Sequence, residues 1–285
     1  MIIGAHLSIA KGMSVAVDQA RTIDGNAFQF FTRNPRGGKA RDISQEEMEE
    51  FQRRRLAEGI RCVVGHMPYT INLATNRPDI HAFGKRTLLT DLRRFNEAGV
   101  EDIVLHPGSH LGDGREMGIS RIVDALTCVL EDYDGDHTIL LLETMAGQGT
   151  EIGGDLLELR EILARLDWPH QMGICLDSCH LFAAGHDLST PEDIDQLLEK
   201  IDDNLGLERV KMVHLNDSKK ELGTRSDRHA KIGQGALGAE GIAEVINHPA
   251  LRGLPFILET PVDSYDEYRE EILLVRQLRM TPSKE

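Results

Sequence analysis

The amino-acid sequence predicts an α/β protein folded as a single (β/α)8 TIM barrel, with an active site at the C-terminal ends of the strands. Eight short apolar segments recur along the 285 residues, and stretches of helical periodicity separate them. Several of these segments are nearly continuous apolar runs, which is typical of parallel strands covered on both faces. The expected strands cover residues 2–7, 27–32, 62–67, 102–107, 138–144, 172–177, 210–215 and 255–260.

The segments between the strands carry helix signals. Ser44 followed by Glu47 fits a capping box, which predicts a helix through Leu56 with Gly59 as its stop. Similar caps and apolar spacing predict helices over residues 155–166 and 264–278 and from Thr190 onward.

An open doubly wound sheet is the alternative architecture. The first turn after a strand, residues 8–12, lacks the GxGxxG pattern, and the sequence contains no P-loop. Nothing specific therefore supports nucleotide binding by an open sheet. We expect one barrel domain over residues 1–280 and a frayed tail over residues 281–285.

The composition narrows the class of protein. A formal net charge of -15 argues against a protein that grips nucleic acid by bulk positive charge. No apolar run approaches the roughly 18–20 residues needed to cross a bilayer, so we expect no membrane partner. The start of the chain does not resemble a signal peptide. The four cysteines lack CxxC spacing, which favours buried reduced thiols and a cytoplasmic protein.

Six successive strands end in a side chain that can bind a metal ion. These residues are His66, His106, Glu143, Asp177, His214 and Glu259. A single histidine or carboxylate at a strand end is usually structural, as a hydrogen-bonded residue or a helix cap. Six in register would need six separate structural explanations, and in a barrel they converge on the face where active sites form.

Two further pairs extend this set to nine residues. His180 lies three residues after Asp177, and Asp227 lies two residues before His229, spacings that place each pair on one side of a helical turn or an extended segment. Imidazoles mixed with carboxylates suit zinc, with manganese or iron as alternatives. Nine ligands exceed the needs of one catalytic ion, so three ions are the natural division. Clustered divalent ions are typical of phosphoester hydrolysis.

The motifs around these residues resemble endonuclease IV, the zinc-dependent apurinic/apyrimidinic endonuclease family of base excision repair. The resemblance runs essentially end to end. It is carried by GAHLS at residues 4–8, FTRN at 31–34, HMPY at 66–69, HPGSH at 106–110, LETMAGQG at 142–149, LDSCH at 176–180, HLNDSK at 214–219, DRH at 227–229 and LETP at 258–261.

The resemblance implies a division of the nine ligands among three zinc ions, with manganese as an alternative at one of them. The first ion would be held by His66, His106 and Glu143; the second by Glu143, Asp177, His214 and Glu259; the third by His180, Asp227 and His229. It implies a monomeric phosphoric diester hydrolase that cuts duplex DNA 5′ to an abasic site with a zinc-activated hydroxide. The products are a 3′-hydroxyl and a 5′-deoxyribose phosphate, and the family also trims blocked 3′ ends.

Lesion recognition in this family uses loop side chains that fill the gap left by the abasic nucleotide. Arg36 and Tyr69 match such positions and are the candidate DNA contacts. Two departures concern affinity and specificity for the lesion. Residues 37–39 replace a sequence that carries a large aromatic in some members, and Thr70 stands where a larger apolar wedge can occur.

Two other functions remain open at this point. A sugar isomerase or epimerase could use a similar barrel, but such enzymes use fewer metal ions and mostly carboxylate ligands, which leaves the histidines unexplained. A lesion-binding or metal-buffering protein without turnover could keep the same ligands. The number of metal ions bound per chain distinguishes a nuclease from an isomerase. An incision assay on abasic DNA distinguishes a nuclease from a protein that only binds DNA or metal.

Overall fold

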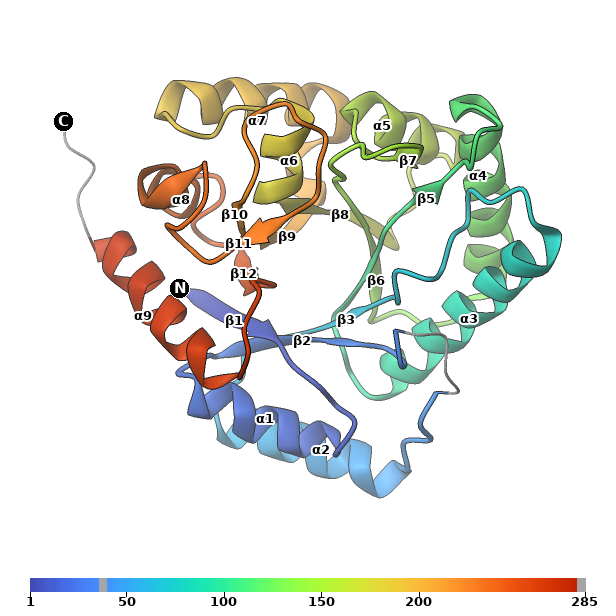
Figure 1. Ribbon diagram of the computed structural model, residues 1–285. Helices are drawn as coiled ribbons and strands as arrows, with labels where there is room; N and C mark the ends of the chain where they lie inside the picture. The colour runs from blue at the N-terminus through green and yellow to red at the C-terminus, as the bar shows by residue number, and fades with distance from the viewer. Residues whose placement is uncertain (36–39, 281–285) are drawn as a thin grey trace.

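The computed structural model describes residues 1–35 and 40–280 of the chain. Its parallel strands form a closed barrel in the order β1-β12-β9-β8-β6-β4-β3-β2, which confirms the predicted fold class. Figure 1 looks along this barrel and shows the helices surrounding the strands. The barrel strands are β1 (Ile2–His6), β2 (Ala27–Phe31), β3 (Cys62–His66), β4 (Asp102–Leu105), β6 (Ile139–Glu143), β8 (Met172–Asp177), β9 (Val210–His214) and β12 (Pro255–Leu258).

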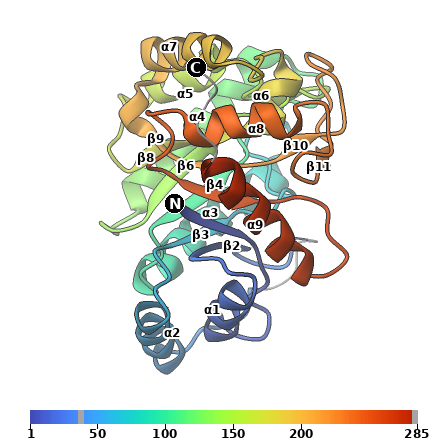
Figure 2. The same ribbon diagram turned by 90° about the vertical axis from the view of Figure 1, so that its left-hand side faces the viewer.

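The helices lie on the outside of the barrel and follow the strands along the chain (Figures 1 and 2). They are α1 (Met13–Thr22), α2 (Gln45–Ala57), α3 (Pro78–Glu97), α4 (Arg115–Asp132), α5 (Leu156–Arg165), α6 (Ser178–Ala184), α7 (Pro191–Leu205), α8 (Gly238–Asn247) and α9 (Asp266–Met280), with a 3-10 turn η1 (Leu207–Arg209). Their apolar faces pack on the barrel in one continuous core. The expected frayed tail, residues 281–285, lies outside the described residues.

The sequence signals for the helix starts agree with the structure. The Ser44 side chain accepts a hydrogen bond from the Glu47 amide at 3.2 Å, and Asp155 and Thr190 cap α5 and α7 in the same manner. The reciprocal half of the capping box is absent, because the Glu47 carboxylate instead accepts from the Met13 amide at 3.1 Å. This contact joins α2 to the start of α1.

Two short antiparallel pairs stand outside the barrel sheet. β5 (Gly108–Ser109) pairs with β7 (Glu151–Ile152), and β10 (Asp217–Ser218) pairs with β11 (His229–Ala230). Across residues 1–35 and 40–280, no helix is long and apolar enough to span a membrane.

A small apolar cluster fills the inside of the barrel. It is made by Ala27, Cys62, Val64, Val104, Leu141, Cys175, Met212 and Ile257. Side chains two positions apart on a strand share a face, so the residue two places after an interior apolar residue also points inward. This alternation decides which polar side chains form the next layer, at the carboxyl ends of the strands.

Candidate metal centre

The six strand-end residues singled out in the sequence all lie in this polar layer. Each follows an interior residue by two positions, as Glu143 follows Leu141 and His214 follows Met212. β4 and β12 end one residue before His106 and Glu259, and the other four residues close their strands. Gln29 and His6 complete the layer from β2 and β1.

The first cluster joins His66, His106 and Glu143. Nε2 of His66 lies 3.2 Å, and Nε2 of His106 3.1 Å, from the same oxygen of Glu143, Oε2. Nδ1 of His66 donates to the Met67 carbonyl at 2.6 Å, which leaves Nε2 as the free lone-pair donor. The donor atoms of the three side chains all lie within 4.8 Å of one another, a spacing that can hold one metal ion.

The second cluster shares Glu143 and adds Asp177, His214 and Glu259. Nδ1 of His214 lies 3.2 Å from Glu143 Oε1 and 3.3 Å from Glu259 Oε2. The two oxygens of Glu143 therefore face different clusters. This is the arrangement of a carboxylate that bridges two ions.

The third cluster joins α6 to the segment that leads into β11. Asp227 lies 3.4 Å from Nε2 of His180 and 3.2 Å from Nε2 of His229, each measured to a different carboxylate oxygen. Nδ1 of each ring faces a main-chain carbonyl, that of Thr144 or of Glu259, at 2.9 and 3.2 Å. Both Nε2 atoms are buried and make no well-formed hydrogen bond within the described chain, so their lone pairs are free for a cation.

The electrostatics of the site favour cations. Burial alone would raise the pKa of Glu143, but the His106 and His214 rings hold that pKa well below its usual range. Burial also opposes ionisation of Asp227, yet its contacts with His180 and His229 lower its pKa strongly. In return, Asp177 and Asp227 overcome burial and raise the pKa of His229 to about 9. Buried carboxylates that stay ionised attract positive charge, whether protons or metal ions.

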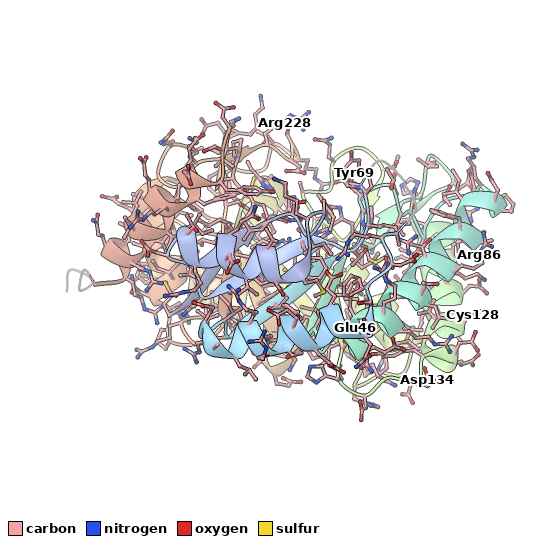
Figure 3. All side chains as sticks on the ribbon, turned by 90° about the horizontal axis from the view of Figure 1, so that it is seen from below. Glu46, Tyr69, Arg86, Cys128, Asp134 and Arg228 are labelled. Carbon is pink, nitrogen blue, oxygen red and sulfur yellow. The ribbon has the colours of Figure 1, made fainter. Side chains whose placement is uncertain are left out.

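A cleft of about 480 Å³ opens above the clusters. Its lining includes His66, His106, His180 and His229, so solute entering it meets the first and third clusters directly. Tyr69 stands on the rim with 58% of its side chain exposed, on the same side of the molecule as Arg228 (Figure 3). Arg36 and residues 37–39 lie outside the described residues.

Three further polar residues lie near the site. Nδ1 of His110 accepts hydrogen bonds from the Gly112 and Gly114 amides at 3.2 and 3.1 Å. His6 lies 3.3 Å from Glu259, in the layer that holds the ligands. The sequence reasoning missed Gln29, although its position two residues after the interior Ala27 is the same signal that the ligands carry.

Comparison with known proteins agrees with this geometry. A family model described as a xylose isomerase-like TIM barrel matches residues 17–278. A probable endonuclease 4 from Heliobacterium modesticaldum is 47% identical over 276 residues, covering 97% of this chain and 98% of that protein. The corresponding protein from Moorella thermoacetica is 46% identical over 279 residues, with 98% and 99% covered. The chain belongs to the endonuclease IV family.

The crystal structure of endonuclease IV from Thermus thermophilus superposes with a TM-score of 0.87 and 36% identity over 98% of both chains. The chain is accordingly an enzyme of the endonuclease IV type. Sugar epimerases also match, such as a 3-keto-D-glucoside 4-epimerase with a TM-score of 0.67, but at 14% identity that likeness shows the fold alone. Family membership thus decides against the isomerase alternative.

Proposed function

We propose that this enzyme hydrolyses the phosphodiester bond 5′ to apurinic/apyrimidinic sites in duplex DNA. The products would be a 3′-hydroxyl and a 5′-deoxyribose phosphate, and blocked 3′ ends would be trimmed by the same site. The observation that carries the proposal is the convergence of nine histidine and carboxylate ligands, in three clusters, beneath one open cleft. Residues 1–280 would act as one domain, in a monomeric cytoplasmic enzyme.

The donor set fits three divalent ions, with zinc as the first choice and manganese as an alternative at one position. We assign His66, His106 and Glu143 to the first ion, and Glu143, Asp177, His214 and Glu259 to the second. The third is assigned to His180, Asp227 and His229. Bound ions would supply Lewis acidity toward the phosphate oxygens and lower the pKa of water.

The chain itself contributes position and charge. Glu143 is wholly buried below the cleft, and its two oxygens set the separation of the first and second clusters. The described lining of the cleft contains no serine or cysteine, and its threonine, Thr260, is buried with its hydroxyl donating to Glu271, so we expect a water molecule as the nucleophile and no covalent intermediate. Preorganised donors of this kind stabilise charge that develops on the phosphate during displacement.

DNA contact would come from the rim of the cleft. Tyr69 offers an exposed ring beside the ligands, where it can stack on bases next to an extruded nucleotide. Lys219, Lys220, Arg225 and Arg228 are exposed on or between β10 and β11, next to the third cluster. These cations are placed to meet backbone phosphates.

Incision and metal content measured on one preparation test the proposal. A duplex with a single abasic site should be cut on its 5′ side by protein that carries three zinc ions per chain, and the matched intact duplex should not be cut. Activity should survive brief chelation of magnesium and disappear after prolonged removal of zinc. Zinc-loaded protein that leaves the abasic duplex intact would contradict the proposed activity.

A further inference from the structure

Gln29 is a wholly buried polar side chain in the middle of β2, in the same layer as the proposed ligands. Its amide oxygen lies 2.8 Å from Nε2 of His214. Its amide nitrogen donates to Oε1 of Glu259 at 2.5 Å and lies 3.0 Å from Nδ1 of His6. One side chain from a strand without a ligand therefore touches two residues of the second cluster.

The chemistry of the amide determines the orientation of both neighbours. A carboxylate that binds a metal ion can only accept, so the amide nitrogen of Gln29 faces Glu259 and its amide oxygen faces His214. An amide oxygen cannot donate, so Nε2 of His214 carries the proton. In the neutral ring, the form that can bind a metal ion, the lone pair is then on Nδ1, which lies between Glu143 and Glu259.

Three other ligand histidines use the opposite nitrogen. Their Nδ1 atoms face main-chain carbonyl oxygens, in the pairs His66–Met67, His180–Thr144 and His229–Glu259. His214 is oriented by the Gln29 side chain instead. Mutation can remove this hydrogen bond, whereas it leaves a main-chain carbonyl in place.

We propose that Gln29 is a positioning residue for the second metal ion. It selects Nδ1 of His214 as the coordinating atom, and it holds one oxygen of Glu259 so that the other, Oε2, faces the cluster. Inside a buried layer a wrongly turned amide would place two acceptors or two donors together, which is costly. Residues that orient ligands in this way typically change metal affinity by about 10- to 100-fold when they are replaced.

Zinc release to a competing chelator tests this inference, which rests on the proposed metal-dependent function. Gln29→Met keeps the volume and removes the hydrogen bonds, and Gln29→Asn keeps the amide but withdraws it by one methylene. Gln52→Met is the matched control, because the Gln52 amide on α2 donates to the main-chain carbonyls of Ala98 and Gly99, just after α3 and away from the site. We expect both Gln29 variants to release one of three zinc ions about 10- to 100-fold more readily, with the other two unchanged.

The ¹⁵N shifts of the His214 ring supply a readout that loss of packing alone would not move. In the zinc-loaded wild type they should show a protonated Nε2 and a coordinated Nδ1, and in Gln29→Met this distinction should be lost. Release of all ions together, or release indistinguishable from that of Gln52→Met, would overturn the inference. Failure of the wild type to cut abasic DNA would reject the proposed activity, while the zinc comparison would still decide the role of Gln29.

Discussion

Glu143 combines three properties that rarely meet in one carboxylate. It is wholly buried, it remains ionised because the His106 and His214 rings lower its pKa against the effect of burial, and each of its oxygens faces a different ligand cluster. A neutral amide of the same shape would keep the packing and remove the bridging charge. We therefore expect substitution of Glu143 by glutamine to affect hydrolysis much more than DNA binding.

Glu143→Gln should lower the rate of abasic-site incision by about 100-fold or more, because one preorganised charge at the site is lost. Binding of uncut abasic duplex should fall far less, since the rim residues are untouched. Single-turnover cleavage and fluorescence anisotropy measure the two effects on one preparation. Glu208→Gln makes the same charge change on the exposed η1 turn and should leave both unaltered. Normal cleavage by Glu143→Gln would show that its assigned role is wrong.

The cysteines are free thiols in two different settings. Cys62, Cys175 and Cys179 are buried, and burial raises the pKa of Cys175 and of Cys179 to about 12. Cys128 is exposed on α4, at the edge of the molecule away from Tyr69 (Figure 3), so the expectation of four buried thiols is wrong at this position. A thiol whose pKa is raised stays protonated and unreactive below that pKa.

Iodoacetamide at pH 8 should therefore label the native protein at Cys128, with Cys62, Cys175 and Cys179 protected. Peptide mass spectrometry identifies the modified site. Cys128→Ser should remove the rapid labelling, and protein unfolded in guanidinium should react at all four positions. Rapid native labelling of Cys175 would contradict the structure.

At the scale of elements, α3 is tied to the loop that follows β2. Asp91 is fully buried on α3 and receives two hydrogen bonds from Arg33, at 2.6 and 2.9 Å. Arg94 adds a contact with Asp91 at 3.1 Å and donates to the Arg41 carbonyl at 2.9 Å. Residues on both sides of the undescribed segment 36–39 are thus anchored to one helix.

Asp91→Ala should lower the free energy of unfolding by about 3–5 kcal/mol, because it leaves the mostly buried Arg33 guanidinium without its carboxylate. Urea unfolding followed by circular dichroism measures the change. Asp79→Ala, at an exposed position in the first turn of α3, should change the free energy of unfolding by less than about 0.5 kcal/mol. Equal effects of the two substitutions would show that the buried pair does not hold the loop.

Elements were predictable where their signals are local. All eight barrel strands follow from apolar runs, and α2, α5 and α7 follow from caps such as Ser44. α6 was not predicted, since six of its seven residues are buried and they show no helical stripe. The pairs β5–β7 and β10–β11 depend on contacts between distant segments, which periodicity does not report.

At the scale of the whole molecule, the negative net charge has to be reconciled with the proposed binding of DNA, which is itself negatively charged. Three divalent ions would offset six of the fifteen excess negative charges. Arg228, one of the exposed cations between β10 and β11, lies on the same side of the molecule as Tyr69 (Figure 3). Affinity for DNA would then come from one face.

Replacing Lys219 and Lys220 together by alanine should weaken binding of abasic duplex and reduce the slope of log affinity against log salt by about two. Both residues are exposed, and the Glu143→Gln background prevents cleavage during the measurement. Lys200→Ala, on the last turns of α7, is the matched control and should leave the slope unchanged. An unchanged slope in the double variant would remove this segment from the DNA interface.

The sequence by itself determined where the strands run, which polar side chains end them and to which family the chain belongs, because apolar runs and motif spacing are local properties. The family resemblance already implied which ligands share a cluster. Only the tertiary structure showed the distances within each cluster and the contacts of Gln29 and His6 with them. The physical reason is that the barrel closes on itself. β1 pairs with β12, as in Ile2 with Pro255, and this pairing brings chain segments about 250 residues apart into one polar layer. Contacts between residues so far apart in the chain produce no periodic pattern in the sequence, so sequence patterns do not predict them.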